Sequence, residues 1–158
     1  MTPSEINQTL INKFANKIVE SNLESPEYYI RVNPQDIPEI ISYLKTSPEM
    51  LMDYLSLVTG IDWDKENKME VVYHLSSIQH HHAIAVHAYL DRNDPKVPSI
   101  VDLYGAANWH ERETYDLLGI VFEGHPDLRR ILLPDDWVGH PLRKDYQFPE
   151  EYHGIKWA

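Results

Sequence analysis

Carboxylates and bases alternate between Ala106 and Lys144, and these are the residue types in this sequence that could perform chemistry. Glu111, Glu113 and Asp116 lie within one short stretch, close enough to form the acid–base pair of a hydrolase. Four bases follow at Arg129, Arg130, Arg143 and Lys144. Burying a carboxylate without a partner is costly, so acids set among aromatic residues favour ion pairs with these bases. We therefore favour a network of ion pairs and keep a free-standing hydrolase that uses Glu111 and Asp116 as the alternative.

A run of histidines, His80-His81-His82, raises the possibility of a metal site. On a strand, the first and third side chains of this run would share one face. No acid lies nearby, however, and the histidines spaced like further ligands are limited to His74 and His87. A zinc site needs three or four ligands that converge on one point. The run is thus predicted to be a solvent-exposed loop, with adventitious nickel or zinc binding as the alternative.

Other motifs for catalysis or cofactors are missing. His110-Glu111 does not begin a zinc-protease helix, because position 114 is Thr114 rather than a second histidine. We find no serine nucleophile elbow, no glycine-rich phosphate loop and no dinucleotide fingerprint. The basic pairs could instead hold a phosphate or an acidic lipid, but acids are interleaved with them at Asp127, Asp135, Asp136 and Asp145. We therefore expect mixed ion pairs at an interface, and no cofactor or metal.

Composition narrows the class of protein further. At 158 residues the chain is long enough for one domain with a substantial core, and 42% hydrophobic with 25% charged residues is typical of globular proteins. The formal charge of −11 argues against nucleic acid as a partner. The absence of cysteine excludes disulfides, thiolate-bound zinc or iron–sulfur clusters and thiol nucleophiles. The first residues have neither a basic region nor an apolar segment, so we expect no signal peptide. No apolar run approaches the roughly 20 residues that a membrane helix needs, so we expect no membrane span.

The stretch with the acids is predicted to begin as a helix. Asn108 could be its N-cap with Glu111 three residues later, and Gly119 could be its C-cap. When this helix is projected at about 100° per residue, its charges do not segregate to one side. Such a helix cannot bury a single apolar face, so it must stand in water or pair its acids.

The rest of the chain supplies a sheet and its helical cover. Helical periodicity predicts helices from about residue 3 to 20 and 36 to 46, and Ser99 could cap a short helix through Tyr104. Glu24-Ser25-Pro26 is expected to break the first helix. Runs typical of strands cover residues 28–32, 54–63, 69–78 and 83–90. The order predicts an α+β fold, with helices covering a mainly antiparallel or mixed sheet.

Beyond Gly119 the periodicity stops. Residues 119–158 contain four prolines, and only Leu128–Leu133 could form a short regular piece. Ordering so long a segment costs on the order of 1–2 kcal/mol per residue, yet it carries many large apolar side chains: Phe122, Leu132, Leu133, Trp137, Tyr146, Phe148, Tyr152 and Trp157. Aromatic and arginine anchors are typical of protein interfaces. We therefore divide the chain into an α+β domain, 1–118, and an extended partner-binding tail, 119–158.

The same residues resemble a known family. Residues 107–113 (ANWHERE), 116–120 (DLLGI), 122–132 (FEGHPDLRRIL) and 139–146 (GHPLRKDY) are similar to the signature of the 30-kDa subunit of respiratory complex I. In bacteria this is the C subunit of NADH–quinone oxidoreductase, and in cyanobacteria and plastids it is the J subunit of the related complex. The similarity spans roughly residues 55–146.

The resemblance implies a peripheral-arm protein that contains no redox centre and no catalytic residue. It implies contacts with the 49-kDa quinone-site subunit (D) and with the iron–sulfur subunits B and I, and a C-terminal segment extended along the 49-kDa partner. It also implies a place on the cytoplasmic side of the cell membrane, without a membrane span. The residues that we expect to be structural or at the interface are Trp109, His110, Glu111, Arg112, Glu113, Asp116, His125, Arg129, Arg130, Trp137, His140, Arg143, Lys144 and Tyr146.

The interpretation from sequence is therefore a non-catalytic scaffold of a proton-translocating NADH–quinone oxidoreductase. The alternative within the same class is the equivalent subunit of a membrane-bound hydrogenase or of a dehydrogenase that uses another donor.

Overall fold

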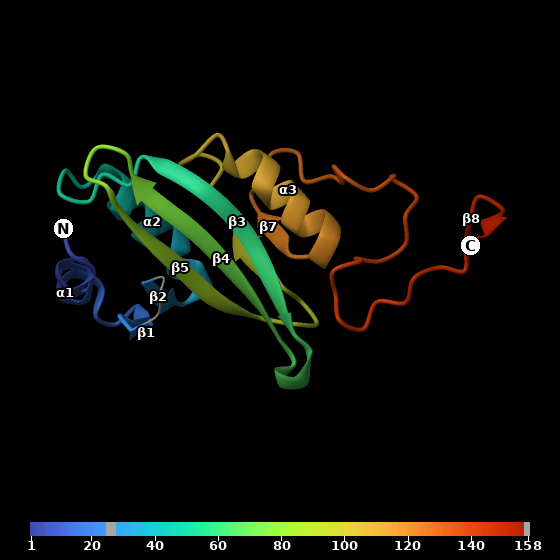
Figure 1. Cartoon of the computed structure of the whole chain (residues 1–158), viewed down its shortest axis with the longest axis horizontal. Helices are drawn as coiled ribbons and strands as arrows, with labels where there is room; N and C mark the ends of the chain where they lie inside the picture. Colours follow the sequence, from blue (N-terminus) through green and yellow to red (C-terminus); the bar gives the residue numbers. More distant parts are fainter. Residues whose placement is uncertain (25–27, 157–158) are drawn as a thin grey trace.

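The protein is built on a five-stranded sheet (Figure 1). The structure is a computed structural model and describes residues 1–24 and 28–156. The strands lie in the order β1-β2-β5-β4-β3. Their bounds are Ile18–Asn22 for β1, Tyr29–Val32 for β2, Tyr54–Trp63 for β3, Lys68–Ser77 for β4 and His82–Asp91 for β5. Neighbours are antiparallel except β2 and β5, which are parallel. The predicted α+β class with a mixed sheet is confirmed.

Helices pack on one side of this sheet. They are α1 (Pro3–Phe14), α2 (Ile37–Thr46) and α3 (Ala107–Leu118). The apolar stripe of α2 is fully buried, and α1 packs against it through the edge contact of Phe14 with Tyr43, whose ring centroids are 5.4 Å apart. The other side of the sheet, which faces the viewer in Figure 1, is formed by the strands themselves. One apolar core between sheet and helices therefore organises the body of the molecule.

Two predictions near the N-terminus need correction or fall outside the described residues. The first helix ends at Phe14 rather than near residue 20, because the β-branched pair Ile18-Val19 begins β1. This strand pairs with β2 and shifts register between Ile18 and Glu20. The sequence signal was ambiguous, since the apolar spacing of the helix continues to Ile18. The expected break at Ser25-Pro26 lies outside the described residues, as does Trp157 of the tail.

The segment before α3 also differs from the prediction. The short helix expected at residues 99–104 does not form: residues 101–103 make only a turn, although Ser99 Oγ accepts a hydrogen bond from Val101 N and donates one to Glu111. Just before Ser99, the strand β6 (Lys96–Pro98) pairs in parallel with β7 (Val121–Glu123). Both strands are short and join segments far apart in sequence, so local patterns did not reveal them.

The tail leaves the body after β7 and runs away from it (Figure 1). Ile120 and Phe122 are buried in the core, so packed structure reaches past residue 118, and the division at that point stays a prediction. Leu128–Leu133 forms neither helix nor strand, contrary to expectation. At the end, β8 (Glu151–Tyr152) and β9 (Ile155–Lys156) form a small hairpin.

Candidate functional site

The helix α3 is the element that joins the body to the tail. Its buried residues lie on several sides and include both acids and a base: Ala107, Glu111, Arg112, Thr114, Asp116 and Leu118. Ala106, not Asn108, is the N-cap, and the expected capping box is absent because the Glu111 side chain points elsewhere. Gly119 ends the helix in the left-handed conformation at φ 77°, as predicted. The helix is therefore surrounded by protein on more than one face, which explains why its charges do not segregate.

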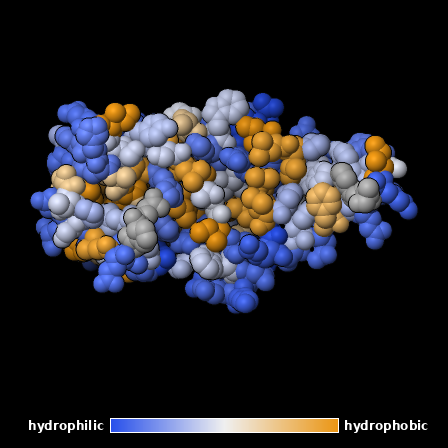
Figure 2. Space-filling view, viewed as in Figure 1, coloured by the Kyte–Doolittle hydropathy of each residue, from blue (hydrophilic) through white to orange (hydrophobic). Residues whose placement is uncertain are grey.

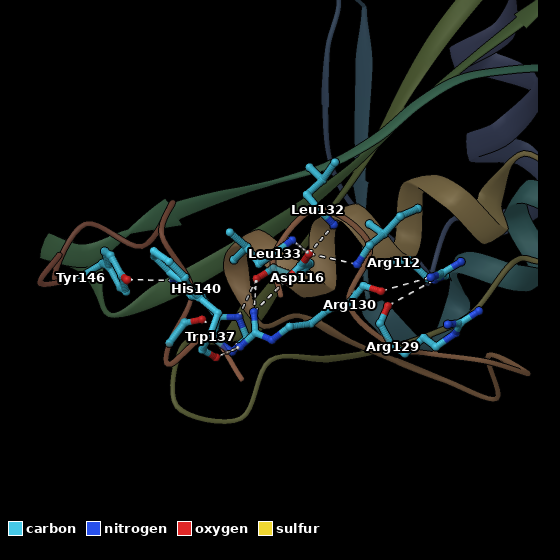
Figure 3. Close-up of polar contacts among 11 residues, drawn as sticks. Arg112, Asp116, Arg129, Arg130, Leu132, Leu133, Trp137, His140 and Tyr146 are labelled. Carbon is cyan, nitrogen blue, oxygen red and sulfur yellow. Dashed lines mark hydrogen bonds and ion pairs between the residues drawn. The ribbon is translucent and has the colours of Figure 1, made fainter. Parts of the chain in front are cut away.

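Asp116 holds the start of the tail (Figure 3). Its Oδ2 accepts hydrogen bonds from the backbone amides of Ile131, Leu132 and Leu133 at 3.0, 2.8 and 2.9 Å. Its Oδ1 accepts a hydrogen bond from Arg130 Nη1 at 2.7 Å. Burial alone would raise the pKa of this carboxyl, but the amides and Arg130 outweigh it and hold the pKa below its usual value. Asp116 is therefore a buried anion with four donors.

Two arginines tie further parts of the tail to the helix. Arg130 also donates through Nη2 to the carbonyl oxygens of Trp137 and Gly139, at 2.9 and 3.0 Å. Arg112 donates to the carbonyl oxygens of Arg129 and Arg130, at 3.2 and 3.1 Å. The planar guanidinium suits such multiple contacts. All four of these hydrogen bonds go to backbone oxygens, so among the described residues the pair of Arg130 with Asp116 is the one contact of these two arginines that joins a base to an acid, as predicted.

The exposed carbonyls at the C-terminal end of α3 are also satisfied by the tail. His140 Nδ1 lies 2.9 Å from the Asp116 carbonyl oxygen, Leu142 N donates to the Leu117 oxygen, and Arg143 Nε donates to Leu118 at 2.8 Å. Such groups have no partner within a helix and need one from elsewhere. Burial, with the nearby arginines, lowers the pKa of His140. The tail thus acts as the C-terminal cap of α3.

A second contact lies between the tail and the tip of the sheet. Lys144 donates through its backbone amide to Asp62 Oδ2 at 2.8 Å. Asp62 is buried and bound by Arg92, which also pairs with Asp145 at 2.9 Å. The hydrogen bond from Arg92 holds the pKa of Asp62 low. A cavity of about 580 Å³ lies here, lined by Ile61, Asp62, Trp63, Asp64, Lys65, Glu66 and Lys144.

Sequence reasoning missed the pair of Asp62 and Arg92. The alternation of Leu57, Ile61 and Trp63 predicts that Asp62 faces away from the core, but the register of β3 shifts between Leu55 and Leu57, and Asp62 is buried. A buried carboxylate there needs a base.

The aromatic residues of the tail contact one another. Trp137 Nε1 donates to the Tyr146 hydroxyl at 3.0 Å, and the Trp137 ring lies against Phe148 and Tyr152 at centroid distances of 5.8 and 5.2 Å. Phe148 nevertheless remains 59% exposed. These residues form a thin cluster outside the core of the body.

The remaining predicted residues lie around the N-terminal half of α3. Trp109 is exposed, with the Arg112 guanidinium 5.4 Å from its ring centroid. His110 is half-buried and Glu113 is exposed. His125 lies 3.3 Å from the Asn108 carbonyl oxygen. These side chains are near the junction but do not converge on a common point.

Arg129 makes a different kind of contact from its neighbour Arg130. Its side chain forms an exposed ion pair with Asp127 at 2.9 Å.

Glu111 departs from the predicted ion-pair network. It is fully buried, and its donors are neutral: the Ser99 hydroxyl at 2.6 Å and the Ile100 amide at 2.8 Å. Burial raises the pKa of this carboxyl to about 7. Glu111 and Asp116 have separate partners and neither is accessible to solvent, so their geometry does not support a hydrolytic pair.

Within residues 1–24 and 28–156, no group of three or more potential ligands could hold a metal ion. His80 and His82 contact the carbonyl oxygens of Pro48 and Met50, at 2.9 and 2.6 Å. Among the helices of the same residues, none has the length and apolar character needed to cross a membrane.

Comparison with known proteins finds one matching family and relatives that are subunits of oxidoreductases. The sequence model of the family described as "Respiratory-chain NADH dehydrogenase, 30 Kd subunit" matches residues 30–152. The C subunit of NADH-quinone oxidoreductase from Chloroherpeton thalassium is 45% identical over 118 residues, which are 74% of this chain and 49% of that protein. The C subunit of F(420)H(2) dehydrogenase from Methanosarcina mazei is 41% identical over 152 residues, 94% of this chain and 95% of the relative. The chain thus spans about half of the first relative and nearly all of the second.

Solved structures share the fold. A trypsin-resistant fragment of Nqo5 superposes with a TM-score of 0.67 and 30% identity, over 81% of this chain and 100% of the fragment. A chain of an archaeal membrane-bound sulfane sulfur reductase, described as a respiratory membrane complex, gives a TM-score of 0.77 and 26% identity, over 93% and 86%.

Proposed function

The chain belongs to the 30 Kd subunit family of the respiratory-chain NADH dehydrogenase, and from this premise we propose that it is a non-catalytic assembly subunit of a membrane-associated respiratory oxidoreductase. Members of this family are parts of larger complexes, so other subunits are its partners. In this proposal the chain contributes no redox centre to electron transfer from NADH to quinone. It lies in the peripheral arm on the cytoplasmic side of the membrane.

The observation that carries the proposal is a tail that is ordered but not buried. Asp116, Arg112 and Arg130 hold its course through polar contacts, while several of its apolar side chains face solvent. Val138 is 85% exposed and Leu142 55% exposed. Apolar side chains held in a fixed arrangement by a polar frame are suited to a partner surface, since little ordering remains to be done on binding.

The exposed apolar surface continues onto the body. Figure 2 shows hydrophobic residues gathered between the sheet and the outlying part of the tail. Leu57 of β3 and Leu142 of the tail line a shallow groove with Leu117 of α3. A contiguous apolar area of this kind typically marks an interaction site. We assign it to the 49-kDa quinone-site subunit (D), with the iron–sulfur subunits B and I as further neighbours.

The electron donor is a separate question with a second candidate. The F(420)H(2) dehydrogenase subunit matches over 94% of this chain and 95% of its own length, whereas the match to the NADH-quinone relative from Chloroherpeton covers 49% of that protein. This favours keeping a complex that uses a donor other than NADH as the alternative. The scaffold role of this chain is the same in both.

Affinity purification from the native host tests the proposal. The tagged chain should recover a 49-kDa quinone-site subunit and iron–sulfur subunits, identified by mass spectrometry. Val138→Glu should reduce this recovery at least ten-fold, because it places a charge at an apolar position that is 85% exposed and that we expect to contact the partner. Val19→Glu on β1, where the native side chain is 64% exposed at the other end of the molecule, is the matched control and should leave recovery unchanged.

Turnover distinguishes assembly from catalysis. Val138→Glu should lower the amount of assembled complex but leave quinone reduction per mole of complex unaltered. If the complex assembled in full and turnover collapsed, the non-catalytic role would be wrong. If wild-type chain were recovered without oxidoreductase subunits, or both glutamate variants behaved alike, the tail would not be the docking surface.

A further inference from the structure

Glu111 occupies a site that the assembly role does not use. It projects from the N-terminal half of α3 toward the segment that follows β6, and its side chain is 0% exposed. Its Oε2 accepts a hydrogen bond from Ser99 Oγ and its Oε1 one from Ile100 N. These contacts join α3 to the strand pair of β6 and β7, because Ser99 N also donates to the Glu123 carbonyl oxygen at 2.8 Å.

The charged groups nearby do not compensate this carboxyl. Arg112, the next residue on α3, donates to the carbonyl oxygens of Arg129 and Arg130. From the tail, His125 contacts the Asn108 carbonyl oxygen. From β4, Tyr73 lies near Glu111; burial raises the pKa of this phenol, and a negative charge on Glu111 raises it further. Across the described residues, no basic side chain lowers the pKa of Glu111.

The supply of hydrogen-bond donors separates Glu111 from Asp116. An ionised carboxylate can accept about four hydrogen bonds. Asp116 receives four N–H donors, one of them from an arginine, whereas Glu111 receives two from neutral groups. The Tyr73 hydroxyl is fully buried and has no hydrogen-bond partner within residues 1–24 and 28–156. The site therefore has an unfilled donor and acceptor beside a carboxyl that lacks a counter-charge.

We propose that Glu111 is a neutral carboxylic acid in the folded chain and that it serves as a pH-sensitive clasp between α3 and the segment Lys96–Tyr104. In the neutral form one oxygen still accepts from Ile100 N, and the acid O–H donates to Ser99 Oγ or toward Tyr73. Ionisation removes that donor and places a negative charge in an apolar site, which weakens the contact. The clasp is closed when the proton is bound and loosens when it leaves.

The direction of the pH effect follows from linkage. The pKa of Glu111 is raised from 4.5 to about 7 in the folded chain. The folded state thus binds a proton that the unfolded state has released between these values, so stability falls as pH rises from about 4.5 to about 7. The contribution is fully present below the unfolded pKa and is lost above the folded one.

A charge-neutral substitution separates this effect from the titration of histidines. We expect the urea midpoint of wild type to fall between pH 5 and pH 8 by more than that of Glu111→Gln, which keeps the neutral shape of the acid. The protection factors of the Ile100 and Val101 amides, that is, their exchange rates relative to an unfolded chain at the same pH, should fall over the same range in wild type and not in Glu111→Gln. Glu113→Gln, on the exposed side of the same helix, is the matched control and should titrate like wild type.

Carbon-13 NMR of the Glu111 side-chain carboxyl reads the proton directly in wild-type protein, even if Glu111→Gln fails to fold. The resonance should titrate near pH 7. A midpoint below pH 5 would overturn the proposal. So would a Glu111→Gln variant that folds but keeps the pH dependence of wild type in both its urea midpoint and its Ile100 exchange.

Discussion

The body and the tail of this molecule are held in place by different physics. In the body, one contiguous apolar core connects α1, α2 and α3 with the sheet, and burial acts over many side chains at once. In the tail, order comes from hydrogen bonds that converge on Asp116, Arg112 and Arg130. Stability is thus distributed in the body and concentrated in the tail, so a single polar substitution should matter far more in the second region.

The two regions meet on one helix, and its halves repeat the contrast. Around Asp116 the carboxylate is charged and fully hydrogen-bonded, and the groups around it come from the tail. Around Glu111 the carboxyl is packed against the body with neutral donors. The pKa values of two carboxyl groups five residues apart are therefore shifted in opposite directions, that of Glu111 upward and that of Asp116 downward, by the groups that each contacts.

Removing the carboxylate of Asp116 should produce the largest difference between the tail and the body in their stability. Asp116→Ala leaves Arg130 and three backbone amides without their acceptor, and breaking a buried ion pair typically costs about 3–5 kcal/mol. We expect this loss in the docking of the tail. Exchange of the Ile131–Leu133 amides should accelerate by more than a hundred-fold, while amides of β4 keep most of their protection.

Two results would contradict the contrast between the regions. Equal acceleration in β4 and in the tail would mean that both unfold as one cooperative unit. Unchanged exchange in the tail would mean that contacts other than Asp116 hold it. Glu113→Ala provides the control, because Glu113 is exposed on the same helix and its removal should alter neither region.

The strength of sequence reasoning here also divides along the two regions. The bounds of β3, β4 and β5 were predicted to within a residue or so, because alternating apolar residues and polar turns are local signals. The C-terminal end of α3 at Gly119 was likewise correct. In contrast, β6 and β7 were missed, since a parallel pair of three-residue strands depends on contacts between distant segments.

The site shows the same limit. The acids and bases of the junction were identified from sequence, but not their partners. Asp116 was expected to meet bases and mainly binds backbone amides, and Lys144 uses its own amide rather than its ammonium group. Glu111 was expected to be paired and is not. Residue types indicate which buried groups need hydrogen-bond partners, whereas the path of an irregular chain decides which groups lie close enough to be those partners.

A smaller effect is expected at Gly119, where α3 ends and the chain turns toward β7. Gly119 adopts φ 77°, and a Cβ there would lie 2.7 Å from the His140 ring. Gly119→Ala should therefore destabilise the junction by about 1–2 kcal/mol from backbone conformation, with some displacement of His140. The measurement is the urea midpoint together with the His140 ring signals in NMR.

Gly105→Ala is the matched control for Gly119→Ala. No atom lies within 4 Å of a Cβ at Gly105, and its φ is not in the left-handed range. Its midpoint should stay close to that of wild type. If Gly119→Ala proved as stable as Gly105→Ala and left the His140 signals unmoved, the tail would not depend on the geometry of the helix end.

The smallest effect should come from Arg129, and it shows that charge alone does not hold the tail. Its guanidinium pairs with Asp127 at the surface, where solvent screens the pair and side-chain entropy opposes it. Arg129→Ala should leave both the urea midpoint and the exchange of Ile131–Leu133 within experimental error of wild type. Arg130→Ala, one residue later, removes donors to Asp116, Trp137 and Gly139 and should release the tail. If the two alanine variants were equally disruptive, overall positive charge rather than the specific contacts of Arg130 would be holding the tail to α3.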